Sequence, residues 1–101
     1  MKPYEKINSI QDLIDFYETI PENKWQTEFF VNEYDKSICC AMGHLGVKDD
    51  ASYIREVEKT LKSIGVCNGF LERFNDGKDL ISRDYGNTPK QRVLSYLKGK
   101  L

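Results

Sequence analysis

Two of the three cysteines and the only histidine of this 101-residue chain fall within ten residues, in the segment SICCAMGHLG at 37–46. If the residues after Cys40 are helical, Cys40 and His44 stand at positions i and i+4, and their side chains share one face. A thiol beside an imidazole is a candidate nucleophile, and Asp76 could orient the imidazole. The segment therefore allows a cysteine-dependent enzyme that uses Cys40, His44 and Asp76.

The same side chains allow two other interpretations. Free cysteine is among the most buried residue types and behaves as a small hydrophobe, so Cys39 and Cys40 fit the lining of a core. A zinc site would combine one of them with His44 and Cys67, and Asp76 would be a fourth ligand. Structural zinc ligands usually come in pairs two to four residues apart, which this spacing lacks. We therefore prefer the core interpretation and expect neither a metal nor a cofactor.

The composition indicates one small globular domain that covers residues 1–101. Hydrophobic residues make up 40% of the chain and charged residues 31%, which lies outside the disordered class. No stretch reaches the roughly 18 apolar residues of a membrane helix, and the N-terminus has no apolar signal segment. An odd number of cysteines, two of them adjacent, does not suggest a disulfide framework. We therefore expect a cytoplasmic protein with reduced thiols and no membrane partner.

The net charge of −1 conceals an uneven distribution along the chain. Residues 78–101 carry six Lys or Arg and two Asp or Glu, whereas residues 1–77 carry nine and fourteen. A basic C-terminal helix can pair with an acidic surface of its own domain, dock on an acidic partner or contact phosphate, and the first is preferred. The glycines form neither a dinucleotide-binding motif nor a P-loop, and specific nucleic-acid binding is not expected.

Three segments place apolar residues at helical spacing between start and stop signals. They cover residues 8–21, 49–65 and 88–101. The first can be capped by Asn8 or Ser9, and the third opens at Thr88 with a proline at its first position. The second ends at Gly65, where a left-handed cap is natural. The sequence therefore predicts three clear helices.

Two further segments carry weaker signals. Residues 66–77 favour a short helix or turn that closes at Asn75-Asp-Gly77, and residues 26–31 and 36–40 favour the strands of a short hairpin. Gly43 suggests that the main chain approaches a neighbour closely there. We therefore predict a mainly α domain, a compact bundle of three clear helices and a short helix with one hairpin, and α+β is the alternative.

Several residues follow one another in the order W…C-A-x-G-x-L…N-D…T…R-V-x-x-x-L, from Trp25 to Leu97. Over roughly residues 25–97 the chain thereby resembles small, largely uncharacterised bacterial and phage proteins. The resemblance implies a bacterial or mobile-element origin but no reaction. It also implies that six residues lie together in space: Cys40, Gly43, His44, Asn75, Asp76 and Arg92. The chain departs from the pattern in carrying a second cysteine at Cys39 and a helix before Trp25, which suggests a different partner.

The leading functional hypothesis is a non-enzymatic binding or interaction module, a phage or mobile-element accessory protein that acts on a host protein or a small anionic ligand. Its expected site is a polar pocket formed by His44, Asn75, Asp76 and Arg92. The Arg92 guanidinium is expected to make a bidentate ion pair with Asp76, or to remain free to bind an anionic ligand. The cysteine-dependent enzyme and the small zinc-binding domain are the alternatives.

Overall fold

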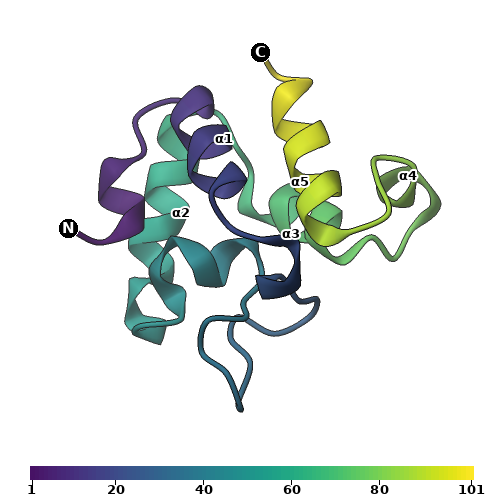
Figure 1. Ribbon diagram of the computed structural model, residues 1–101. Helices are drawn as coiled ribbons and strands as arrows, with labels where there is room; N and C mark the ends of the chain where they lie inside the picture. Colours follow the sequence, from purple (N-terminus) through teal and green to yellow (C-terminus); the bar gives the residue numbers. More distant parts are fainter.

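The chain folds into five α-helices joined by short helical turns, with almost no β structure (Figure 1). The computed structural model describes all residues, 1–101. The α-helices are α1 (Ile10–Glu18), α2 (Ile54–Ser63), α3 (Asn68–Asp76), α4 (Leu80–Arg83) and α5 (Pro89–Lys98). Turns of 3-10 helix cover Pro3–Lys6, Glu22–Lys24 and Ala51–Tyr53, and Gly43–Val47 form a π-helical turn. The predicted mainly α class is confirmed, and none of the helices has the length and apolar character to span a membrane.

Side-chain caps and one glycine fix the ends of the three helices that were predicted. The Ser9 and Thr88 hydroxyls each accept a hydrogen bond from the backbone N–H three residues further on, at 3.0 and 3.1 Å. The Asp50 carboxylate accepts one from the turn that leads into α2. Gly65 follows α2 with a φ of 80°, a conformation that costs glycine little. α1 and α5 therefore begin where the sequence predicts and α2 ends just before Gly65, but residues 51–53 of the second predicted helix form a 3-10 turn, and α1 and α5 end at Glu18 and Lys98, three residues earlier than predicted.

The predicted hairpin of 26–31 and 36–40 is wrong. Cys39 forms only two isolated bridges, a parallel one with Trp25 and an antiparallel one with Val31. Glu28 has a φ of 74°, which interrupts the extended run. The Asn32 side chain accepts hydrogen bonds from the backbone N–H groups two and three residues further on. These local bonds form turns where a ladder of strand pairs was expected.

The core gathers apolar side chains of α1, α2, α3 and α5 around Cys40, Ala41, Met42 and Leu45 of the central segment. The helix α5 packs against both α1 and α3. Cys39 and Cys40 are both buried, as the core interpretation predicted, and Cys40 belongs to the main apolar cluster. The Tyr17 hydroxyl of α1 donates to the carbonyl of Ala41 at 2.8 Å. A Cβ at Gly43 would overlap the carbonyl oxygen of Phe30, which confirms the expected close approach of the main chain.

The basic C-terminal helix pairs with the domain's own acidic surface, as preferred. The Lys98 ammonium lies 3.0 Å from the Glu18 carboxylate, and Lys90 donates to the backbone carbonyl of Glu18 at 3.1 Å. The Lys100 ammonium lies 5.4 Å from the centre of the Tyr96 ring. These cations therefore already have partners within the domain.

Candidate functional site

His44 is buried beneath the loop that carries Trp25. It lies one helical turn after Cys40, since its backbone N–H donates to the Cys40 carbonyl at 3.0 Å. Its side chain is 3% exposed, and its Nε2 donates to the carbonyl oxygen of Lys24 at 2.7 Å. The imidazole also packs against the Trp25 ring, with ring centres 5.2 Å apart. Burial lowers the pKa of His44 to about 4, so the ring is neutral at pH 7.

The two neighbouring cysteines are buried thiols. Burial raises the pKa of Cys40, and the backbone N–H groups of Met42 and Gly43 offset that shift only in part. Burial also raises the pKa of Cys39 to about 11. No hydrogen bond joins the Cys40 thiol to the imidazole of His44. Both thiols therefore stay protonated near neutral pH, which is unfavourable for a nucleophile.

Asn75 ties the end of α3 to the central segment. Its side chain is 1% exposed, its Oδ1 accepts from the Ala41 N–H at 3.0 Å, and its Nδ2 donates to the Gln26 carbonyl at 2.9 Å. The neighbouring Asp76 Oδ1 accepts from the Glu28 N–H at 2.9 Å and from Asn75 Nδ2 at 3.2 Å. These two side chains therefore hold the irregular loop that replaces the predicted hairpin.

Arg92 is held internally, but by partners other than the expected one. Its Nε and Nη2 donate to the carbonyl oxygens of Phe74 and Asn75, each at 2.8 Å, and its Nη1 donates to the Gly86 carbonyl at 3.4 Å. No ion pair joins it to Asp76, so the expected bidentate pair is wrong. The reason lies in the backbone, because the last carbonyls of a helix have no partner within it and attract a cation.

The turn after α3 is shaped to receive this guanidinium. Gly77 adopts a left-handed φ of 60° and ends the helix. A Cβ at Gly77 would overlap the Nε of Arg92. Glycine is therefore needed there for both its conformation and its lack of a side chain.

The residues of the predicted pocket are only partly gathered around one cavity. Cys40, Asn75 and Asp76 border a small cavity of about 90 Å³ together with Glu28 and Glu72. His44 and Arg92 are absent from its lining. Burial raises the pKa of Glu72, and the charges of Asp76 and Glu58 raise it further. This acidic cavity is therefore a poor place for an anion.

The ligands considered for zinc are not assembled. Cys67 is exposed before the first turn of α3, whereas Cys39 and Cys40 are buried. No group of three or more His, Cys, Asp or Glu side chains could hold a metal ion. The three cysteines therefore do not converge on one point.

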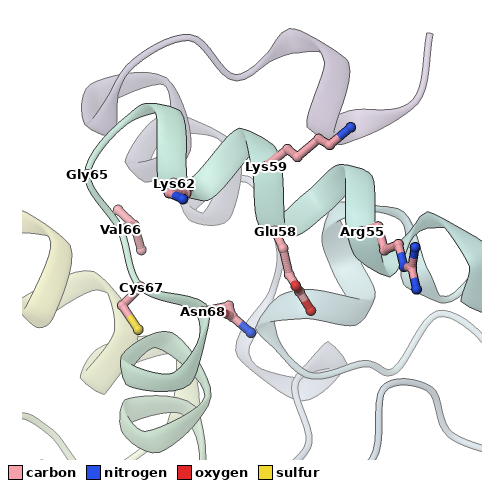
Figure 2. A pocket seen from close by; sticks show the side chains of 8 residues that line it. All are labelled: Arg55, Glu58, Lys59, Lys62, Gly65, Val66, Cys67 and Asn68. Atoms are coloured by element: carbon pink, nitrogen blue, oxygen red, sulfur yellow. The ribbon is translucent and has the colours of Figure 1, made fainter.

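A larger cavity lies on the surface where α2 faces the start of α3. We call it the α2–α3 groove; its volume is about 650 Å³. Figure 2 shows α2 as one wall, the connection from Gly65 as the other, and the Glu58 carboxylate pointing toward Asn68. Eight residues line it: Arg55, Glu58, Lys59, Lys62, Gly65, Val66, Cys67 and Asn68.

The α2–α3 groove carries positive charge that the domain leaves largely unpaired. Arg55 and Lys62 form no ion pair, and Lys59 makes a single exposed contact of 4.0 Å with Glu56. Glu58 is the one carboxylate in the lining. The first three backbone N–H groups of α3 also lack an acceptor, because Cys67 provides no side-chain cap. They add partial positive charge at the end of the groove.

Sequence reasoning missed this groove because it followed rare residue types and the basic C-terminus. The available signal was the spacing of Arg55, Lys59 and Lys62, which places three cations along one side of a predicted helix. Comparisons with protein-family models, with curated proteins and with solved structures give no match. The geometry and charge of the groove are therefore the features of this chain that point to a function.

Proposed function

We propose that this chain is a small non-enzymatic binding module that takes a negatively charged ligand or partner surface into the α2–α3 groove. The observation that carries the proposal is a cavity of about 650 Å³ lined by three cations and one carboxylate. An open cavity with apolar walls and a few charged groups is the usual form of a binding site. Coulombic attraction would favour an anion there and would speed its encounter with the protein.

The interior polar side chains support this assignment by what they already do. His44, Asn75 and Arg92 each have partners within the domain and are buried. Using any of them on a ligand would leave a buried backbone group without its hydrogen bond. In our proposal they hold the fold, and the groove side chains recognise the partner. The partner is a small anion or a host protein, as expected for an accessory protein.

The proposal is tested by titrating ¹⁵N-labelled protein with inorganic phosphate, citrate and acidic peptides while recording amide chemical shifts. We expect shifts concentrated at residues 55–70, lost in Lys62→Glu and kept in Lys36→Glu. Lys36 is exposed on the loop between Val31 and Cys39 and receives the same change of charge, so it is a matched control. Absence of a localised response to every anion would overturn the proposal.

A further inference from the structure

The spacing of charge in the α2–α3 groove indicates the shape of its occupant. Arg55 and Lys62 are seven residues apart on α2, which places them on nearly the same face and about 10 Å apart along the axis. A single carboxylate or phosphate cannot contact the ends of both side chains while each remains beside its own part of the helix. An occupant that meets both cations in these positions therefore needs two negative groups.

We infer that the occupant is an extended acidic segment of another protein, with Asp or Glu at positions i and i+3. This inference rests on the proposed function and specifies its ligand. In a polyproline II conformation the chain rises about 3.1 Å per residue with three residues per turn. Side chains at i and i+3 therefore lie on one side, about 9 Å apart, close to the spacing of Arg55 and Lys62.

The second wall of the groove suits such a segment. It is formed by Gly65, Val66, Cys67 and Asn68, which connect α2 to α3 (Figure 2). Val66 is 2% exposed, so the apolar surface of this wall comes from Gly65 and the exposed Cys67, together with the aliphatic stems of the cations on α2. This surface can contact the uncharged positions of a peptide. Unfolded chains already populate the polyproline II conformation, so binding would require little reordering of the segment.

Glu58 favours a peptide over a nucleic acid. It lies between Arg55 and Lys62 on α2 and lines the same groove. A continuous row of phosphates would bring negative charge close to this carboxylate. A peptide with acids at i and i+3 has two residues between them, whose backbone N–H groups could donate to Glu58. The groove lining also contains no aromatic ring on which a base could stack.

The experiment measures fluorescence anisotropy with two labelled peptides built from Ala, Pro and two Glu. In one the glutamates are at i and i+3, and in the other they are adjacent. We expect the i, i+3 peptide to bind roughly fivefold more tightly, because the adjacent pair can satisfy only one cation. Arg55→Gln and Lys62→Gln should each remove this preference, whereas Lys36→Gln should keep it.

Each result has a distinct consequence. Equal affinity for the two peptides, or a preference that survives both groove substitutions, would overturn the inference. Tighter binding of an oligothymidine strand than of either peptide would also overturn it and indicate a nucleic acid. If inorganic phosphate or citrate shifts the groove amides but neither peptide binds, the acidic segment is wrong and the proposed function stands. If no probe binds, both fail. Circular dichroism melting curves establish that each variant is folded.

Discussion

The buried polar side chains and the α2–α3 groove use polar groups in opposite ways. The sequence pointed to His44, Asn75 and Arg92 as candidate site residues. In the structure each of them has a hydrogen-bond partner inside the domain. Arg55 and Lys62 are ordinary surface cations by sequence, and neither has an ion-pair partner. Burying a polar group without a hydrogen-bond partner is costly, so the polar side chains that a fold buries are those that find partners inside it. The side chains that stand out in the sequence therefore stabilise the fold, whereas the unpaired surface cations are free to bind a ligand.

The largest contrast is expected in thiol chemistry, since the three cysteines divide between the two regions. Cys67 is exposed at the groove, whereas Cys39 and Cys40 are buried with raised pKa values. We expect iodoacetamide at neutral pH to modify Cys67 at least about a hundredfold faster than the other two, because they must wait for the protein to open. Mass spectrometry of the folded protein measures this. Rapid modification of Cys40 would restore the nucleophile interpretation.

Removal of the Arg92 side chain should destabilise the domain clearly. Arg92→Ala leaves the carbonyls of Phe74 and Asn75 without their donors and opens space beside Gly77. We expect a loss of about 3 kcal/mol in the free energy of unfolding, measured by urea denaturation. Lys100→Ala, at an exposed position, should change stability by less than about 0.5 kcal/mol. If Arg92→Ala is as stable as this control, Arg92 is not a structural group.

The buried histidine should make stability depend on pH. His44 has a pKa of about 4 in the folded protein and about 6.5 when unfolded, so the unfolded chain binds the extra proton between these values. Stability from this group is fully present above pH 6.5 and is lost as the pH falls toward 4, by up to about 3 kcal/mol. Urea denaturation at several pH values measures the loss. His44→Gln, which retains a donor for Lys24, should flatten this part of the profile.

Local sequence signals predicted the helices because caps, glycine stops and apolar spacing act over a few residues. Ser9 and Thr88 cap where their sequence context says they should. Local signals could not predict the conformation of residues 26–40, because it depends on distant residues. Asn75 and Asp76, about fifty residues further along the chain, form hydrogen bonds with the backbone of Gln26 and Glu28. These distant hydrogen bonds, together with the local turn at Asn32, outweigh the strand propensity of this segment.

The candidate site was harder to predict than the fold for a related reason. Sequence shows that Arg92 is a cation with a planar fork, but not that helix α3 ends beside it with free carbonyls. Likewise, the net charge of residues 1–77 is negative, so the local excess of cations on α2 is hidden in the sum. A charged side chain remains unpaired or gains a partner according to its neighbours in the folded structure, which the sequence alone does not show.

The smallest effects on stability are expected in the groove, in contrast to the buried polar side chains. Lys62→Gln and Glu58→Gln remove charges that make no ion pair in the domain, so each should change the free energy of unfolding by less than about 0.5 kcal/mol. Their effects on binding should have opposite signs. Lys62→Gln removes an attractive charge and should weaken phosphate or citrate binding, whereas Glu58→Gln removes a repulsive one and should strengthen it roughly two- to fivefold. Urea denaturation and amide-shift titrations measure the two quantities on the same samples. A loss of stability in Lys62→Gln as large as that in Arg92→Ala would mean that the groove, too, is structural.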